Sequence, residues 1–499
     1  MQGLKIMFNI YQLGVMKKSN LFIFNVIIFA IVQIIGLNGC ANIIPPTGGL
    51  RDSLPPVLML SVPKDSTLNF KTNNITLTFD EYVLLDDNVS QDIIVSPNPE
   101  TMPLVAAKLK NVTIKLKDSL KPNTTYSINL GNSLKDVNEG NKFRNFTYVF
   151  STGDALATGS FRGNVTLAET GAADSTLLVL LYSNLHDSAV KKLKPDYYTK
   201  LDSSGNFRFR FLPAETFAVY AVPNDYSKRY DDSTKIFAFY NAPIKVSDNP
   251  DSIKLYAYQQ EKMIDKSRVA ATVPDNKKDK KTEDKRLKIT NNLESNLQDI
   301  LGNLELNLNR RIATFDTTGI RLTDTNYNAM KGYTWFIDTG FQKYSLQFKW
   351  PENEEFKLII LKEAFADSAG ITLSKNDTVS FKTKRESQYG SIKLHFNNLD
   401  KSRNPVLFLV QNENIVKKVA LNTTDWFQKL IEPGDYQIRI LYDENKNLTW
   451  DPGNFDKKLQ PEIVQRIPRK LTIKPNWDNE VELICNFHST YFRQHLSKF

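Results

Sequence analysis

Ile75-Thr76-Leu77-Thr78-Phe79 decides the fold of the chain, because apolar and polar side chains alternate along it. A period of two places one set of side chains on the core face of a sheet and the other set in water, as in a half-buried antiparallel strand. The same alternation recurs at residues 112–116, 207–211, 304–308 and 436–441. We therefore predict an all-β protein.

Turn-forming residues separate these segments at short intervals, as in Glu432-Pro433-Gly434-Asp435. Many short strands with turns between them predict tandem β-sandwiches of about 100 residues each. One stretch departs from the period of two, because Leu293, Leu297 and Leu301 recur at near-helical spacing. We expect one short helix near residues 292–301.

The order of the segments repeats along the chain. Residues 130–136, which precede a strand pattern, parallel residues 361–367, which precede another. A strand pattern that begins Gly-Ser follows each of them, at Gly159-Ser160 and at Gly390-Ser391, and a wholly apolar segment comes next. We predict a duplicated pair of sandwiches in the order A-B-A-B. Because few residues are identical, a chance alignment of alternating strands is the alternative.

The N-terminal region has the pattern of a lipoprotein signal. Lys17-Lys18 precedes an apolar run over residues 21–37, and Leu37-Asn38-Gly39-Cys40 follows, so that Cys40 matches the lipidated cysteine at a signal peptidase site. An uncleaved anchor is the alternative, although 17 residues are near the lower limit for a bilayer core of ~30 Å. Asn38 departs from the small or β-branched residue usual there. We expect acyl chains such as palmitate on Cys40, which would hold the protein to the membrane.

The residues after Cys40 bear on location. No Asp follows Ala41 to retain a lipoprotein in the inner membrane, so we predict the outer membrane, with the periplasmic and cell-surface faces both open. The net charge of +9 does not predict nucleic-acid binding. Residues 262–288 hold ten basic and five acidic residues, and the remaining mature chain is nearly neutral. That stretch predicts a solvated linker.

Several of these residues carry a resemblance to a known class. Pro45-Pro46-Thr47-Gly48-Gly49, then Phe79-Asp80-Glu81 and Val95-Ser96-Pro97, resemble bacterial lipoproteins with the Ig-like domain that also occurs in S-layer proteins. Gly205-Asn206-Phe207-Arg208-Phe209 and Leu212-Pro213 make the B units similar to prealbumin-like or carboxypeptidase-regulatory-like sandwiches. The resemblance implies Ig-like and prealbumin-like folds and no catalytic residues to transfer.

The predicted division of the chain follows from these patterns and from the resemblance. It comprises a signal peptide (1–39), a lipidated tether (40–55), an Ig-like domain (56–153), a prealbumin-like sandwich (154–258), a charged flexible linker (259–290), a degenerate second Ig-like domain (291–385), a second prealbumin-like sandwich (386–485) and a tail (486–499).

One stretch could bind a metal ion. Oxygen-bearing side chains alternate in it as a calcium loop requires, at Asp443, Asn445, Asn447, Thr449 and Asp451. Calcium is thus the one candidate ion, and we expect no other cofactor. Yet Leu448 stands where such a loop needs Gly, and a polar turn between two strands would have the same composition.

Other residues suggest binding or modification. Trp426, Trp450 and Trp477 could stack on sugar rings or fill a sandwich core. Asp-Ser and Asp-Thr pairs recur, which is typical of O-glycosylation acceptors in some exported proteins and equally of β-turns. The candidate acceptors are Ser66, Ser175, Ser188 and Ser368.

No nucleophile elbow, phosphate-binding loop or zinc-protease motif occurs in the chain, and it contains only four histidines. Asp80 and Glu81 are adjacent, so they point to opposite faces of a strand and could not flank one bond. We predict a protein that is not an enzyme, a structural stalk or docking module for a protein partner in the cell envelope. The alternative is a glycan-binding lipoprotein that uses the three tryptophans.

Overall fold

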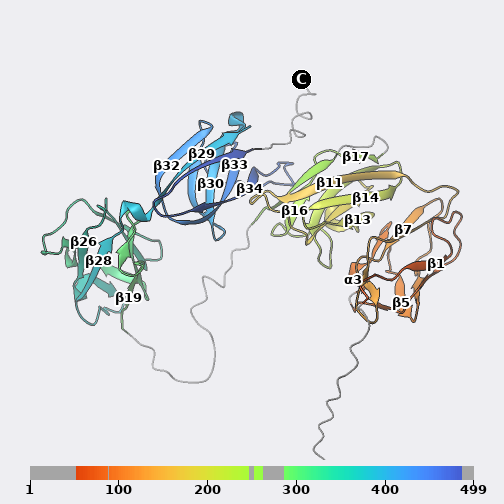
Figure 1. Cartoon of the computed structure of the whole chain (residues 1–499), viewed down its shortest axis with the longest axis horizontal. Helices are drawn as coiled ribbons and strands as arrows, with labels where there is room; N and C mark the ends of the chain where they lie inside the picture. The colour runs from red at the N-terminus through yellow and green to blue at the C-terminus, as the bar shows by residue number, and fades with distance from the viewer. Residues whose placement is uncertain (1–51, 88, 247–251, 262–285, 486–499) are drawn as a thin grey trace, which may run out of the picture.

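The structure is a computed structural model that describes residues 52–87, 89–246, 252–261 and 286–485. These residues form tandem Ig-like β-sandwiches, so the predicted all-β fold is confirmed (Figure 1). The α-helices among them are the single turns α3 (Val89–Asp92) and α4 (Ser188–Lys192). None of the described helices has the length and apolarity to cross a bilayer.

The first A unit has two main sheets and a small one. The four-stranded sheet has the order β1 (Leu58–Val62), β2 (Asn74–Phe79), β6 (Asn111–Lys115), β5 (Leu104–Lys108). The facing sheet has the order β10 (Thr147–Ser151), β7 (Thr125–Asn129), β4 (Ile94–Ser96). The small sheet contains β3 (Val83–Leu85), β8 (Leu134–Asp136) and β9 (Lys142–Phe143).

The second A unit repeats this arrangement. Its four-stranded sheet has the order β19 (Ile289–Asn291), β21 (Leu304–Leu308), β25 (Lys343–Gln347), β24 (Thr334–Ile337). The facing sheet has the order β20 (Leu297–Gln298), β28 (Asp377–Thr383), β26 (Glu355–Ile360), β23 (Ile320–Asp324). The small sheet pairs β22 (Ile312–Phe315) with β27 (Phe365–Asp367), as β3 pairs with β8.

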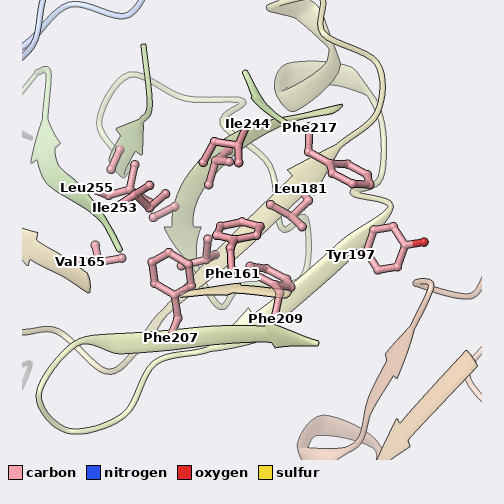
Figure 2. Packing of buried hydrophobic residues seen from close by; sticks show 14 of the residues in the cluster. Phe161, Val165, Leu181, Tyr197, Phe207, Phe209, Phe217, Ile244, Ile253 and Leu255 are labelled. Atoms are coloured by element: carbon pink, nitrogen blue, oxygen red, sulfur yellow. The ribbon is translucent and has the colours of Figure 1, made fainter. Parts of the chain in front are cut away.

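The first B unit has an eight-stranded sheet. Its order is β13 (Tyr197–Lys200), β12 (Leu177–Tyr182), β15 (Thr216–Pro223), β16 (Ile236–Phe239), β18 (Ile253–Gln259), β11 (Gly159–Leu167), β14 (Asn206–Leu212), with β17 (Ile244–Lys245) on β15. The first and last long strands, β11 and β18, pair in parallel. Phe161, Phe207 and Phe209 converge with aliphatic side chains in its core (Figure 2).

The second B unit repeats most of these pairings in two separate sheets, because β34 and β35 do not pair as β16 and β18 do. One sheet has the order β31 (Asn414–Ala420), β30 (Pro405–Gln411), β33 (Gly434–Tyr442), β34 (Ile463–Ile473). The other has the order β32 (Asp425–Ile431), β29 (Gly390–Asn397), β35 (Asp478–Ile484), with β29 and β35 in parallel. The topology of each unit thus recurs, as expected for the duplicated A-B-A-B order.

An aspartate at matching places in the two A units reflects the repeat. Asp136 ends β8, and its carboxylate accepts backbone hydrogen bonds from Glu139, Gly140 and Asn141 at 2.6–2.9 Å. Asp367 ends β27 and likewise accepts backbone hydrogen bonds within the loop that follows. Both carboxylates are buried. The repeated aspartate therefore holds the loop after the strand.

The prediction of a short helix near residues 292–301 is wrong. The chain there forms a tight turn in which Ser295 and Asn296 both have positive φ, and β20 follows it. Leu293 and Leu297 are half-buried whereas Leu301 is exposed, so the three leucines share no buried helical face. A polar turn, Glu294-Ser295-Asn296, separates the first two leucines and breaks the helical path.

Candidate interaction surfaces

The four units are not arranged in space in the order of the sequence. The second B unit lies against the first B unit, so that the A units occupy the two ends of the molecule (Figure 1). Three contacts between neighbouring units produce this arrangement: first A with first B, first B with second B, and second B with second A.

The contact between the B units begins with strand β12. All six of its side chains are buried, although a strand on a sandwich surface normally alternates. Leu177, Val179 and Leu181 face the core of the first B unit. Leu178 and Leu180 face the opposite side, where a second apolar cluster covers them. The outer face of this sheet is therefore a contact surface.

Phe455, from the loop between β33 and β34 of the second B unit, belongs to that cluster. Its side chain is buried among aromatic rings of the first B unit, with centroid distances of 5.0 Å to Phe237, 5.2 Å to Phe239 and 5.9 Å to Tyr220. These distances suit edge-to-face packing, which adds to the free energy gained by burying a large ring. Phe455 therefore anchors one B unit to the other.

Polar contacts surround this anchor. Lys191 Nζ lies 2.6 Å from Asp456 Oδ1, and Lys458 forms an ion pair with Asp187. Gln460 Nε2 donates to the carbonyl oxygen of Phe239 at 3.0 Å. The contact thus has an apolar centre and a polar rim, as protein interfaces usually do.

A cleft of about 620 Å³ lies between the same two units. The first B unit contributes Lys254 and Tyr256 to its lining, and the second contributes Arg466, Arg469 and others. Burial lowers the pKa of Lys254. The lining thus contains three basic residues and one acidic residue, Glu482.

The loop that presents Phe455 begins at the predicted calcium site. The two carboxylate oxygens of Asp443, which is fully buried, accept backbone hydrogen bonds from Lys446 at 2.7 Å, Asn447 at 3.2 Å and Leu448 at 2.7 Å. One Asp451 oxygen accepts hydrogen bonds from the side-chain amides of Asn445 and Asn447 at 2.6 Å and 2.8 Å. These oxygens therefore stabilise the loop through N–H donors.

Glu462 closes the same loop. Its carboxylate accepts hydrogen bonds from the backbone of Glu444 and of Asp451, and its carbonyl oxygen accepts one from the Trp450 indole at 2.7 Å. Burial, with the charges of Asp443 and Asp451, raises the pKa of Glu462. Within the described ranges, no three His, Cys, Asp or Glu side chains converge as metal ligands. Calcium binding, in which Thr449 would be a further ligand, stays a prediction.

The three tryptophans lie in different environments. Trp426 packs against the core of the second B unit, and Trp450 packs against the clusters at the contact between the B units. Trp477 is exposed, with Lys474 Nζ 4.8 Å from its ring centroid. The structure therefore does not bring the three rings onto one exposed surface.

The candidate glycosylation sites are all exposed, at Ser66, Ser175, Ser188 and Ser368. The aspartates before them have structural contacts. For example, Asp174 Oδ1 accepts hydrogen bonds from both the backbone and the hydroxyl group of Thr176, and Asp65 Oδ1 accepts one from Val149. Asp174 thus stabilises a local turn and Asp65 a contact with a distant strand, and modification of the four serines stays a prediction.

Cys40, the Pro-Thr-Gly-Gly segment and residues 486–499 lie outside the described residues, as does most of the predicted linker. Cys485 is buried, and burial raises the pKa of its thiol to about 11. A thiol with that pKa stays protonated and unreactive near neutral pH.

The contacts with the A units include polar pairs, and at the first A unit Ile94 also packs against the apolar cluster of the first B unit. At the first A unit, Asp92 pairs with Lys200 at 2.9 Å, and the Asn98 side chain donates to the Pro195 carbonyl oxygen at 2.9 Å. At the second A unit, the hydroxyl of Tyr389 donates to Asp299 Oδ1 at 2.5 Å and accepts the backbone N–H of Ile300 at 3.0 Å. Each B unit therefore holds the A unit that precedes it.

The sequence reasoning missed Phe455. Two signals could have pointed to it: a lone aromatic residue in the polar stretch Asp451–Lys458, and the unbroken apolar run Leu177–Tyr182. A strand with no polar side chains needs cover on both faces. Neither signal says that the two segments meet.

Comparison with solved structures returned matches of low overall similarity. Part of native alpha-2-macroglobulin from Escherichia coli is 12% identical at a TM-score of 0.19, and covers 32% of this chain and 66% of that chain. The major pilin subunit of Bacillus cereus is 13% identical at a TM-score of 0.15, and the match covers 66% of this chain and 99% of that chain. The S-layer protein SbsC is 12% identical at a TM-score of 0.15, and the match covers 86% of this chain and 54% of that chain. Such TM-scores carry no statement about function.

No curated protein matches the chain. A match to a protein family covers residues 52–152, which is the first A unit with its flanking residues. The family is described as the bacterial Ig-like domain, in agreement with the resemblance carried by Phe79-Asp80-Glu81. Together with the tandem sandwiches, this match suggests a structural or surface role without enzymatic activity. Over residues 52–152, the chain is similar to the bacterial Ig-like domain family.

Proposed function

We propose that the protein is a noncatalytic lipoprotein, held in the outer membrane by acyl chains on Cys40. Its sandwiches act as a stiff stalk or docking module for another envelope protein. The observation that carries this proposal is the Phe455 anchor, because it joins the two B units into one body. Tandem domains joined only by a linker would bend at that point.

The buried carboxylates support a structural role. Asp136, Asp367, Asp443 and Glu462 are the buried acids of the described residues, and each accepts backbone N–H groups. A catalytic acid or base needs an oxygen that can reach a substrate. These oxygens instead stabilise loops at the ends of strands. The same use recurs in both A units, as expected for a repeated structural element.

The basic and apolar segments before Cys40 support the lipid anchor. The test of the anchor is the intact mass of the protein from native membranes, together with separation of inner and outer membranes. We expect a mass equal to residues 40–499 plus acyl chains, found in the outer-membrane fraction. A mass that includes residues 1–39 would refute lipidation and favour the uncleaved anchor.

The test of docking is cross-linking in native membranes, followed by capture of the protein and mass spectrometry. A Phe455→Ala variant is the matched control, because it loosens the contact between the B units and leaves Cys40 intact. We expect one envelope protein to be cross-linked reproducibly, with a lower yield for the variant. Equal sets of cross-linked proteins from both would argue against a docking body that depends on stiffness.

A further inference from the structure

The first A unit has large apolar side chains exposed at the end where the chain begins β1. Six of them have exposed fractions of 47–69%. We call this group the anchor-side patch; it consists of Leu54, Val57, Tyr82, Leu84, Leu109 and Val137. Single exposed apolar residues are common on proteins, whereas a group at one place marks a contact surface.

Backbone hydrogen bonds bring the patch together from separate segments. Val57 and Asp80 are joined twice, by Val57 N–H to Asp80 Oδ1 at 2.8 Å and by Asp80 N–H to the Val57 carbonyl oxygen at 3.1 Å. Val83 N–H donates to the Leu109 carbonyl oxygen at 3.0 Å, and Val137 N–H donates to that of Tyr82 at 3.1 Å. The patch is thus part of the folded sandwich.

Leu109 is the most informative member of the patch. It lies at the tip of the β5–β6 hairpin with a φ of +57° and an exposed fraction of 64%. Asn or Gly would suit that backbone better, and a polar residue would suit water better. Lys108 and Lys110 flank it, and Lys110 Nζ lies 5.9 Å from the Tyr82 ring centroid. An apolar tip between two lysines, beside an exposed tyrosine, fits a lipid interface.

The length of the tether indicates which surface covers the patch. Residues 41–51 lie between Cys40 and the described residues, and eleven residues span at most roughly 40 Å when fully extended. If Cys40 is lipidated, the first A unit cannot leave the vicinity of the bilayer. A weak apolar contact is then strengthened by the high local concentration of lipid.

We propose that the anchor-side patch rests in the headgroup region of the bilayer that holds Cys40. The proposal deepens the proposed function and rests on lipidation of Cys40. Leu109 and its neighbours would enter the boundary between headgroups and acyl chains, about 5–10 Å deep. The anchored first A unit would then have a fixed orientation relative to the membrane.

The charges near the patch predict how it binds. Asp52, Asp80 and Glu81 lie at the same end of the unit as Lys108 and Lys110, so the surface is not basic. The contact should therefore depend on apolar burial rather than on anionic lipid, and change little with salt.

The experiment uses the lipidated chain in vesicles of phosphatidylethanolamine and phosphatidylglycerol. A fluorophore is attached at Leu109→Cys in one sample and at Tyr327→Cys in another. Tyr327 is the matched control, because it is exposed and has a φ of +64° in the second A unit. Buried Cys485 should not react. The intact mass first establishes that Cys40 carries lipid.

We expect nitroxide-labelled lipid to quench the fluorophore at position 109 several-fold more than the one at position 327, and iodide in water to show the reverse. Equal quenching at both positions in a lipidated sample would overturn the proposal and leave the lipid anchor standing. A mass without acyl chains would refute the anchor and, with it, the proposal.

A second variant guards against a disturbed fold. Leu109→Asn suits the positive φ, so its stability to urea should equal or exceed that of the parent. With the fluorophore at Val137→Cys, we expect quenching by labelled lipid to fall in the Leu109→Asn background. Unchanged quenching would show that Leu109 does not hold the patch to the bilayer, against the proposal.

Discussion

Phe455 of the second B unit packs edge-on against Phe237 of the first, with ring centroids 5.0 Å apart and an interplanar angle of 68°. This pair joins units that a second A unit and a linker separate in the sequence. Because Phe455 comes from a polar loop with charged neighbours, its burial depends on the docked arrangement.

Replacing Phe455 with Ala should separate the B units. We expect the contact between the two B units to lose about 3–5 kcal/mol of stabilising free energy, as for other buried Phe→Ala changes. Small-angle X-ray scattering should show a larger radius of gyration, and urea should separate the unfolding of the two units. Phe427→Ala is the control, because Phe427 is exposed. An unchanged scattering profile would contradict the anchor role.

Asp443→Ala should destabilise the loop whether or not calcium is present. Three backbone N–H groups would lose their acceptor, which costs about 1–3 kcal/mol when the groups are buried. Thermal unfolding in calcium and in chelator should give the same midpoint for the parent chain, and the same decrease for the variant. A midpoint that rises with calcium in the parent alone would instead establish the Asp443 loop as an ion site.

Asp136→Asn should weaken the first A unit in a way that depends on pH. Burial raises the pKa of Asp136, but hydrogen bonds from Gly140, Glu139 and Asn141 outweigh it and lower the pKa overall. The ionised carboxylate therefore contributes stability above its unfolded pKa of about 3.9, and this contribution is lost as the pH falls through the folded value. Urea unfolding should be measured from pH 7 to pH 3. The difference in free energy of unfolding between the parent and the variant should become smaller in acid. A constant deficit would mean that charge is not involved.

Tyr389→Phe should loosen the second A unit from the second B unit. The Tyr389 hydroxyl contacts Asp299 and Ile300, and burial with the Asp299 hydrogen bond raises its pKa. A hydrogen bond to a charged group is worth about 1.5–3 kcal/mol. Hydrogen exchange should become faster at residues 299–302, while Tyr226→Phe, at a fully exposed site, should change nothing. No change at residues 299–302 would exclude this role.

Alternation predicted the β fold because it depends on burial of one face, which the sequence shows directly. The helix near residues 292–301 was wrong for a local reason. Leucine spacing alone does not show that Ser295 and Asn296 adopt positive φ, and that turn overrides the spacing.

The contact between the B units could be predicted only in part. The apolar run Leu177–Tyr182 indicates that both faces of β12 are covered, so the sequence predicts that a second segment packs on its outer face. Which segment covers that face depends on long-range packing. Phe455 gives only a local signal, an aromatic residue among polar ones, and nothing near it names Tyr220 or Phe237 as its neighbours.

The distance in sequence between β12 and Phe455 has a consequence for biogenesis. If the chain is exported from its N-terminus as proposed, the inner core of the first B unit can form early, but its outer aromatic face is uncovered until Phe455 has crossed the membrane. During that interval the nascent protein would expose Tyr220, Phe237 and Phe239 to water and to other chains. Export of the kind proposed here should therefore depend on chaperones beyond the membrane, and truncation before Phe455 should yield aggregates even though the first two sandwiches are whole.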